Sequence, residues 1–371
     1  MGEIRALERA DLQEVADLLV RVFQKRDATA SAEMRDYLGT ISLDLPDRHP
    51  DITCLVYAGS DGAILGFLGA YTQRMQLGDQ QLIAAIGHSL AVSPDLSDPT
   101  AGARLCRRLF QGAQDLTISD RANPVSTGLW RSLGGDVLPF YSLDWRRVLR
   151  PVEAASHRLR RRLGLLRPSL PLARTGDRLL AQLAASRGQP LLPQPELPLK
   201  PRGMHRRDAD RGGMMEALRA LAGEDALHPI WSDAGLELQL DHALQKKDFG
   251  EPVQQVVTDA GGRFAGAYIY HLAPMGEAAV LQVFSRRALA GQVLDHLLVD
   301  ALERGAVAIG GRAQPRLIEP LMERGAVFSS VARCVFTARD PLVLKAAREG
   351  DAMLGGLVGE AWPRLHGDRL Q

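Results

Sequence analysis

The chain has 371 residues, which is long for a single hydrophobic core, so two domains are the default expectation. Its composition is 46% hydrophobic and 24% charged, which is that of an ordinary globular protein and excludes a disordered or fibrous chain. The formal net charge of +1 argues against a protein that binds nucleic acid through a globally basic surface.

The cysteines and the N-terminal residues indicate in which cellular compartment the protein is expected. The three cysteines, Cys54, Cys106 and Cys334, are widely spaced and odd in number, so they predict neither a disulfide framework nor a zinc site. Residues 1–9 carry charge where a signal peptide would need an apolar core. No apolar run approaches the roughly 20 residues of a membrane span. We therefore expect a soluble, cytoplasmic protein with no transmembrane segment and no metal.

The first half of the chain alternates short strands and helices, judged from hydrophobic periodicity and turn residues. The expected elements are, in order, a strand at 4–7, a helix at 12–23, strands at 53–57, 64–72 and 82–92, a helix at 104–113, a strand at 116–119 and a helix at 125–133. This order is typical of a mixed α/β domain that starts with antiparallel strands and contains one parallel crossover.

The composition changes between residues 146 and 202. Eight arginines fall between Arg146 and Arg167, and prolines crowd the stretch from Pro190 to Pro201. We interpret this stretch as an interdomain connector with short basic helices and a semi-rigid, Pro-rich end. Two alternative interpretations of this stretch are that it contacts an anionic membrane surface or that it contacts nucleic acid.

After the connector the first pattern returns. The expected elements are a helix at 214–221, strands at 253–258, 264–271 and 278–284, a helix at 293–304, a strand at 306–309, a helix at 315–324 and a strand at 327–337. The shared order indicates an internal repeat, although two unrelated α/β domains would also fit. We predict an N-terminal domain at 1–149, a connector at 150–202 and a C-terminal domain at 203–371. The tail of the last domain would dock on a domain surface through Trp362.

Three stretches of the first half are candidates for a ligand-binding or catalytic site. Leu90-Ala91-Val92-Ser93-Pro94 ends the strand expected at 82–92. The loop from Ser97 to Arg104 enters the next helix, where successive amides and a helix N-terminus can hold an anion. The stretch from Asn123 to Gly135 contains the helix expected at 125–133. With the element order, these stretches resemble the GNAT superfamily of acetyl-CoA-dependent N-acetyltransferases.

The resemblance implies two mixed, mostly antiparallel sheets flanked by helices, and acetyl-CoA or another acyl-CoA as cofactor. In that family the strand at 82–92 diverges from its parallel neighbour and pairs with the amides of pantetheine, here through Leu90, Ala91 and Val92. The pyrophosphate would lie on the following loop. The residues implied there are Ser97, Thr100, Ala101, Gly102, Ala103 and Arg104.

That loop matches the family pattern only in part. Gly102 stands at the final glycine, whereas Thr100 replaces the first glycine and Ser97 replaces the basic residue, so Arg104 would supply the charge. A plain strand-to-helix turn would use the same residues. In the second half, Gly291 is kept but Leu289 would obstruct a phosphate, so we interpret that loop as a relic that does not bind one.

The third stretch places Asn123 near the cofactor and packs Ser126 and Trp130 beside the CoA tail, as the resemblance implies. In the family a tyrosine at the position of Trp130 is commonly the general acid toward the departing thiolate. Tryptophan cannot give a proton at neutral pH, so another group protonates the thiolate, or the thiolate leaves unassisted, or the domain does not catalyse. Tyr141, expected on the following strand, is a substitute acid or a half-buried strand aromatic.

Amine acylation also needs a base, because most amines are protonated near neutrality. His88 is the ionisable residue expected to face the substrate on the strand at 82–92, and the ordinary histidine pKa of about 6.5 suits a base acting through water. A satisfied, half-buried strand histidine is the alternative. The corresponding strand of the second half offers only Gln282, so the N-terminal domain is the better catalytic candidate.

We therefore predict an acyl-CoA-dependent N-acyltransferase that transfers an acetyl group to a primary amine of a small molecule or peptide, with CoA bound by the N-terminal domain. A Fem-type aminoacyl-tRNA-dependent transferase also resembles two such domains, but the near-neutral charge argues against RNA binding. A degenerate, non-catalytic pair that serves as a binding module is a third reading, since fold alone does not decide function.

Overall fold

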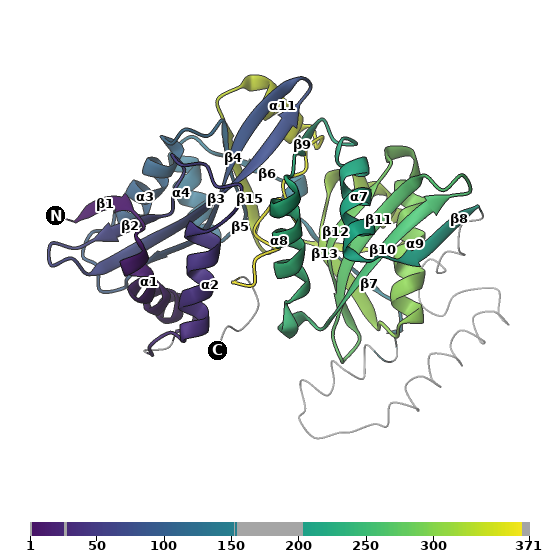
Figure 1. The fold of residues 1–371 in the computed structure, drawn as a ribbon, viewed down its shortest axis with the longest axis horizontal. Helices are drawn as coiled ribbons and strands as arrows, with labels where there is room; N and C mark the ends of the chain where they lie inside the picture. Colours follow the sequence, from purple (N-terminus) through teal and green to yellow (C-terminus); the bar gives the residue numbers. More distant parts are fainter. Residues whose placement is uncertain (1, 26–27, 152, 154–202, 366–371) are drawn as a thin grey trace. The chain divides into compact units, whose positions relative to one another are not determined.

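The computed structural model describes residues 2–25, 28–151, 153 and 203–365 (Figure 1). The connector expected at 150–202 therefore lies almost entirely outside the described residues, together with its basic helices and Pro-rich end. The chain forms two compact units. Unit 1 comprises Met1–Leu143, Ala222–Asp248 and Ser330–Gln371, and unit 2 comprises Asp144–Leu221 and Phe249–Ser329.

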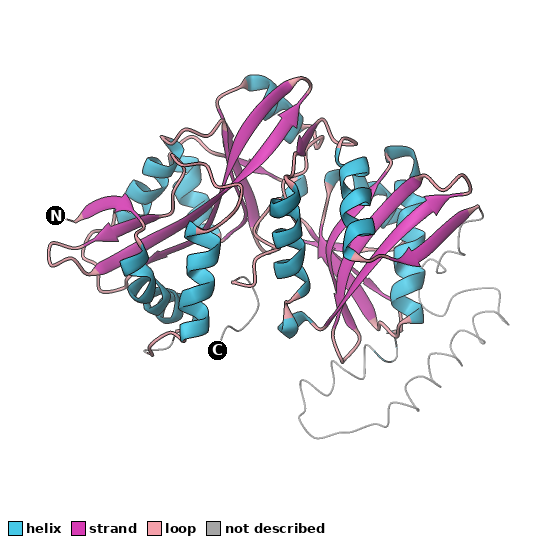
Figure 2. Cartoon of the chain, in the orientation of Figure 1, coloured by secondary structure: helices cyan, strands magenta, loops and turns pink. Residues whose placement is uncertain are grey.

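Unit 1 is a sheet with helices on both faces (Figures 1 and 2). Its strands are β1 (Glu3–Ala6), β2 (Leu55–Ala58), β3 (Ile64–Leu77), β4 (Gln80–Val92), β5 (Leu116–Ala122), β6 (Asp136–Leu138), β9 (Leu227–Pro229) and β15 (Arg333–Ala338). Its helices are η1 (Arg9–Asp11), α1 (Leu12–Leu19), η2 (Val20–Gln24), α2 (Ala32–Leu43), α3 (Ala101–Phe110), α4 (Pro124–Ser132), η3 (Phe140–Ser142), α8 (Asp233–Leu244) and α11 (Pro341–Arg348).

Alternating apolar residues divide the strands of unit 1 between two cores, because successive strand side chains point to opposite faces. Val56 of β2 belongs to the core beneath α1 and α2, and its neighbour Leu55 belongs to the core beneath α3 and α4. The same division holds on β3, where Phe67 and Leu68 lie in different cores. The sheet is therefore buried on both sides.

Several helices begin at a side-chain cap that the sequence provides. Ser31 accepts a hydrogen bond from the Met34 amide at the start of α2, and Ser232 does the same for Gly235 at the start of α8. Each cap satisfies an amide that has no partner within its helix. The sequence analysis missed both of these helices, although their serine caps were visible in it.

Unit 2 is a second mixed sheet. Its strands are β7 (Asp144–Val148), β8 (Met204–Asp208), β10 (Glu251–Asp259), β11 (Phe264–Leu272), β12 (Glu277–Ser285), β13 (Ala308–Arg312) and β14 (Val327–Ser329). Its helices are α7 (Arg211–Ala222), η5 (Arg287–Leu289), α9 (Ala290–Glu303), η6 (Pro315–Leu317) and α10 (Ile318–Glu323), and η4 (Lys247–Phe249) lies at its border with unit 1. Helix α9 approaches β11 so closely that a Cβ atom at Gly266 would lie 2.5 Å from Val293.

The predicted fold class is confirmed, with two mixed sheets flanked by helices. Their strand orders are β1-β2-β3-β4-β5-β15-β6, with β9 beside β3, and β14-β7-β13-β12-β11-β10-β8. Within each sheet one pair is parallel, β4 with β5 and β12 with β13, and the other pairs are antiparallel. No helix among the described residues has the length and apolar character of a membrane span.

Three strands lie in the sheet of the opposite half, and β9, from the second half, is one of them because it pairs with β3. Strand β15, from the end of the chain, lies between β5 and β6, and β7, from the first half, lies between β13 and β14. The expected strand at 327–337 is therefore wrong as one element: it is split at residues 330–332 into β14 and β15, which join different sheets. The units are discontinuous, whereas we expected continuous domains at 1–149 and 203–371. Independent folding of those two ranges stays a prediction.

We expect Phe336→Ala to weaken unit 1 more than unit 2. Phe336 of β15 is fully buried and lies opposite Ile118 of β5, and removing a buried phenylalanine typically costs about 3–5 kcal/mol. Hydrogen exchange should then accelerate in β5 and β6 more than in β10 and β11. Val331→Ala is the control, because the Val331 side chain is 80% exposed. A larger loss of protection in β10 and β11 would contradict the exchange of strands.

Candidate functional site

The parallel ladder between β4 and β5 stops before either strand does. The paired residues run from Ala84 with Leu116 to Ile86 with Ile118, yet β4 continues to Val92 and β5 to Ala122. Past this point β5 remains paired with β15 on its other side. Residues 87–92 of β4 therefore turn one backbone edge away from the ladder, and we refer to them as the open edge. Leu90, Ala91 and Val92, the predicted pantetheine-binding residues, all lie on it.

The open edge contains a β-bulge. Across the β3–β4 pair, Phe67 lies opposite Ala91 and Gly69 lies opposite His88, so Leu68 alone faces both Ser89 and Leu90. Ser89 has a φ of 52°, in the left-handed region that few residues other than glycine adopt. A bulge of this kind interrupts the ladder and redirects the backbone groups beside it, and such strained residues cluster at functional sites.

The loop before α3 carries a carboxylate where the resemblance implied a phosphate. Asp98 accepts hydrogen bonds from the Thr100 amide at 2.9 Å and the Thr100 hydroxyl at 2.6 Å, and these bonds lower the pKa of Asp98 to about 2. The Arg104 guanidinium donates to the same carboxylate at 3.1 Å and lies over the Tyr57 ring. The charge expected from Arg104 is therefore already paired. Ser97 is exposed at the surface of this loop.

The first turn of α3 follows directly. It comprises Ala101, Gly102 and Ala103, and a Cβ atom at Gly102 would lie 3.4 Å from Leu129 and 3.7 Å from Val92. This turn thus packs against the end of the open edge. The structure brings together the strand end and the helix start that the sequence analysis assigned to one ligand.

Trp130 belongs to the core beneath α3 and α4. Its ring lies edge-on to Phe110 with centroids 4.6 Å apart, and a Cβ atom at Gly87 would lie 3.7 Å from it. Trp130 thus packs against the point where β4 and β5 part. Asn123 accepts a hydrogen bond from the Ser126 amide at 2.9 Å and so caps α4. Of the three predicted residues, Trp130 is therefore a packing group, and Asn123 caps the helix through the Ser126 amide.

His88 lies on the opposite face of β4, among aromatic rings. It is 2% exposed, and its ring centroid is 5.4 Å from that of Tyr71 and 6.4 Å from that of Phe67. A Cβ atom at Gly69 would lie 2.2 Å from the His88 ring, so only glycine fits opposite it. Burial lowers the pKa of His88 to about 4. The imidazole is therefore neutral at pH 7. If it were the base, the pH–rate profile would have its acid limb, the range in which the rate falls with falling pH, near pH 4 instead of pH 6–7.

Tyr141 lies in the short helix η3, and its expected place on a strand is wrong. Its hydroxyl donates to the Ala352 carbonyl at 2.9 Å and accepts from the Ala352 amide at 3.1 Å. Burial raises its pKa. Because donor and acceptor are both engaged with one residue, Tyr141 anchors the chain near Ala352, and its proton reaches a thiolate only if this pair breaks.

The C-terminal segment from Ala352 to Leu365, which we call the tail, packs into unit 1. Trp362, predicted to be a packing anchor, is 1% exposed; its ring lies edge-on to Tyr71 and stacks on His242 of α8. The Tyr71 hydroxyl donates to the Gly359 carbonyl. The tail therefore lies on the face of the sheet that carries His88.

The tail brings a carboxyl group to β5 that the sequence analysis did not identify. Glu360 accepts hydrogen bonds from the Ser119 hydroxyl at 2.6 Å and from the Arg121 amide at 3.2 Å, both beyond the last pair of β5 with β4. Its own amide donates to Asp120 at 2.8 Å. Burial, and next the negative charge of Asp120, raise the pKa of Glu360 to about 7. The only hint in the sequence was an acidic residue in a stretch that is otherwise apolar from Ala352 to Pro363.

Unit 2 repeats the diverging strands but closes them. The β12–β13 ladder ends at Val280 with Gly311, and β12 continues to Ser285. Beyond that end, the Gln314 side chain accepts from the Val283 amide at 3.0 Å and donates to the Val283 carbonyl at 2.8 Å. This side-chain amide pairs with the strand as a peptide would. At the corresponding place in unit 1 stands Asn123, which caps α4 instead.

The helix start of unit 2 is covered as well. A Cβ atom at Gly291 would lie 2.8 Å from the Arg324 guanidinium, which is held by Asp295 and by the Pro320 carbonyl at 2.9 Å. Leu289 is the last residue of the short helix η5, directly before α9. These contacts agree with the interpretation of this loop as a relic.

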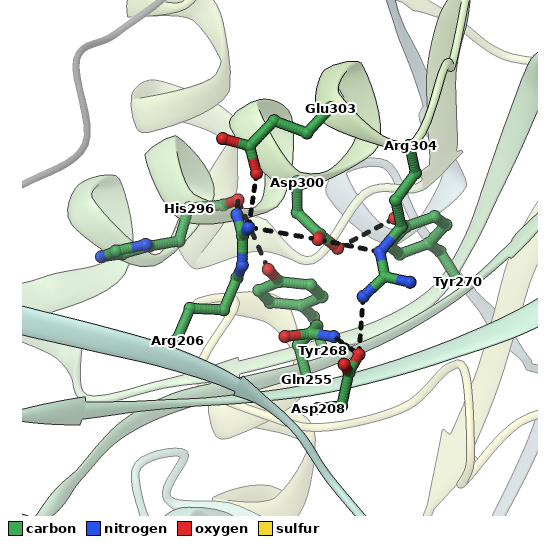
Figure 3. A network of polar contacts seen from close by, with 9 residues as sticks. All are labelled: Arg206, Asp208, Gln255, Tyr268, Tyr270, His296, Asp300, Glu303 and Arg304. Carbon is green, nitrogen blue, oxygen red and sulfur yellow. Dashed lines mark hydrogen bonds and ion pairs between the residues drawn. The ribbon is translucent and has the colours of Figure 1, made fainter.

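The polar cluster of unit 2 shown in Figure 3 ties its sheet to α9. Asp300 of α9 is 1% exposed, accepts from the Tyr270 hydroxyl at 2.9 Å and pairs with Arg304 at 3.0 Å. Arg304 also pairs with Asp208 of β8, and Arg206 of β8 pairs with Glu303. Buried charges are stable only when they are paired in this way. The cluster thus has a structural role.

No protein-family model matches the sequence, and the search among curated proteins finds no match. Solved structures do match over most of both chains. The chain has a GNAT-superfamily fold.

The similar structures are far from this chain in sequence. A probable N-acyltransferase from Enterococcus faecalis V583 matches with a TM-score of 0.58 and 11% identity, over 91% of this chain and 72% of that one. A GCN5-related N-acetyltransferase from Anabaena variabilis matches with a TM-score of 0.58 and 10% identity, over 92% and 73%. Eis1 from Mycobacterium abscessus matches with a TM-score of 0.52 and 15% identity, over 94% and 76%. At such identities the likeness establishes the GNAT fold alone.

We expect Gln314→Ala to expose the backbone of Val283. The variant removes two hydrogen bonds, whose loss at a buried backbone costs roughly 1–3 kcal/mol, so the protection of the Val283 amide against hydrogen exchange should fall by at least about tenfold. Asn123→Ala is the matched control in unit 1; it should loosen the start of α4 and leave β4 unchanged. Unaltered exchange at Val283 would mean that Gln314 does not close this strand.

Proposed function

We propose that the chain is an acyl-CoA-dependent N-acyltransferase that binds its cofactor on the open edge of β4 in unit 1 and acylates a primary amine of a small molecule or peptide. The observation that carries the proposal is the end of the β4–β5 ladder at Ile86 and Ile118, followed by a bulge at Ser89. Unit 2 lacks a comparable free edge because Gln314 occupies it.

The open edge fits the pantetheine arm of CoA. Pantetheine carries two amides, and a diverging strand offers amides and carbonyls that pair with them as a further strand would. Leu90, Ala91 and Val92 would hold this arm through their backbones. The site fits the pyrophosphate less well, because Asp98 brings a negative charge to the loop and engages Arg104. Phosphate binding would then depend on the amides of Gly102 and Ala103 at the first turn of α3, since the Ala101 amide donates to the Asp98 carbonyl at 3.3 Å.

When bound, an acyl-CoA supplies an activated thioester. The bulge at Ser89 holds backbone amides of β4 in fixed positions beside the parting strands. Fixed amides of this kind stabilise the negative oxygen that develops when an amine attacks a carbonyl. Trp130 packs at the same point and excludes water without giving a proton. His88, which we predicted as the base, stays a candidate for positioning the acceptor from the opposite face of β4.

A non-catalytic binding module is the second candidate. The carboxylate of Asp98 in the phosphate loop and the tryptophan at the place of the family acid favour it. Titration of CoA by calorimetry, followed by an assay of thiol release with a library of primary amines, separates the two. Binding without thiol release from any amine would support the module, and binding with amine-dependent release would support the enzyme.

We expect Gly102→Leu to weaken CoA binding by roughly 1–3 kcal/mol, because a large side chain at this turn blocks the amides that would face phosphate. A Cβ atom alone fits there, so Gly102→Ala should have a smaller effect. Gly212→Leu in α7 is the control, since nothing lies within 4 Å of a Cβ atom at that position. Equal affinities in calorimetry for the wild type and Gly102→Leu would place the ligand elsewhere.

We expect Asp98→Asn to tighten CoA binding at low ionic strength. Asparagine can still accept the hydrogen bond from the Thr100 amide, but it removes the negative charge and releases Arg104. The gain should shrink as salt is added, because screening weakens charge interactions at the surface. Asp95→Asn is the matched control, since Asp95 is exposed in the same loop and pairs with Arg21. Weaker binding by Asp98→Asn at every salt concentration would contradict phosphate binding at this loop.

A further inference from the structure

We infer that Glu360 of the tail is the proton acceptor of the acyl transfer, so that the end of the chain completes the catalytic site of unit 1. The inference rests on the proposed function, and it names a residue that neither the sequence motifs nor the fold comparisons assign. It is carried by where the carboxyl group is held, by what surrounds it and by the chemistry that amine acylation requires.

The position of Glu360 follows from the parting of β4 and β5. Its carboxylate accepts from the Ser119 hydroxyl and from the Arg121 amide, which follow Ile118, the last residue of β5 that pairs with β4, by one and three positions. The open edge of β4 begins opposite this same point, at Gly87. One strand of the parted pair thus keeps a free backbone edge, and the other receives a carboxylate.

A chain of contacts connects Glu360 with the bulge. The His88 ring, next to Ser89, lies 5.4 Å from the Tyr71 ring. The Tyr71 hydroxyl donates to the carbonyl of Gly359, the residue directly before Glu360. His88, Tyr71 and the tail therefore line one face of the sheet. Glu360, the one carboxylate of the tail, is thus held on β5 directly beyond the point where the strand parts from β4.

The surroundings of Glu360 explain why it can exchange a proton near neutrality. Four titratable groups act on or beside it: Asp120 and Arg121 of β5, Tyr71 of β3, and Lys246, whose ammonium donates to the Ala361 carbonyl at 2.7 Å. Burial and the like charge of Asp120 raise the pKa of Glu360, while the hydrogen bonds from Ser119 and the Arg121 amide lower it. The balance leaves the pKa at about 7, which suits a general base at physiological pH.

The proton balance needs one base and no protein acid. The acceptor ammonium gives one proton to the Glu360 carboxylate and becomes a neutral amine. Its nitrogen forms the C–N bond with the thioester carbon, the C–S bond breaks, and the second amine proton passes to the departing thiolate. Glu360 then returns its proton to water, so each turnover releases one proton together with an amide and a free thiol. Trp130 stands where the GNAT family commonly has its general acid, and these steps do not require an acid there.

The two candidate bases differ in their predicted rate limbs. If His88, with a pKa of about 4, is the base, the rate should not change between pH 5 and 9. If Glu360 is the base, the rate should fall as the pH drops below about 7, because only the ionised carboxylate accepts a proton. We expect Glu360→Gln to remove this limb and to lower kcat by roughly 10²- to 10⁴-fold, with CoA affinity unchanged. His88→Gln should keep the limb. Glu349→Gln, an exposed glutamate of the same terminal region, is the control.

Two further variants shift the limb without removing the carboxyl group. Ser119→Ala deletes a hydrogen bond that favours the ionised form and should move the limb to higher pH. Asp120→Asn deletes a like charge and should move it to lower pH, while its oxygen can still accept from the Glu360 amide. Opposite shifts support the inference even if Glu360→Gln folds poorly.

The outcomes separate the inference from the proposed function. If the wild type acylates amines and the limb stays in place in Glu360→Gln, Ser119→Ala and Asp120→Asn, the inference is wrong and the proposed function stands. If calorimetry detects no CoA binding and no amine is acylated by the wild type, the proposed function fails and the inference fails with it. A limb near pH 4 that is lost only in His88→Gln would assign the base to His88.

Discussion

The site depends on the point where the parallel β4–β5 ladder ends. Up to Ile86 and Ile118 the two strands satisfy one another, and beyond them each must find other partners. Strand β5 has them: β15 lies along its outer edge, and Glu360 accepts from Ser119 and Arg121. Strand β4 keeps its edge turned away from the ladder. The proposed binding site rests on this asymmetry between the two strands.

The two units show opposite uses of the same geometry. In unit 2 the amide of Gln314 pairs with Val283 in both directions, and Arg324 covers the first turn of α9. In unit 1 the side chain at the matching place, Asn123, is turned to its own helix. The closed strand of unit 2 and the open edge of unit 1 therefore differ in one side chain and its direction. Under the proposed function, this contrast predicts one cofactor per chain.

The tail links the last residues of the chain to the first sheet. Trp362 packs on Tyr71 and His242, and the adjoining Glu360 is thereby buried beside Asp120. Burying two carboxyl groups side by side is unfavourable unless one of them holds a proton or accepts strong hydrogen bonds. Packing of the apolar residues of the tail offsets this cost. A destabilised carboxyl group held by packing elsewhere is typical of functional sites.

Local patterns in the sequence were sufficient for the repeat, for most helices and strands, and for the α/β class, because periodicity and turn residues act over a few neighbouring positions. They also located the strand end at Leu90–Val92 and the turn at Gly102. Only the tertiary structure decided the exchange of β7 and β15, since short strands of similar pattern carry no label for their sheet. It also decided the charge state around Glu360, whose partner Ser119 is 241 residues away. A pKa depends on burial and on neighbours in space, and neither can be read from the spacing of residues along the chain.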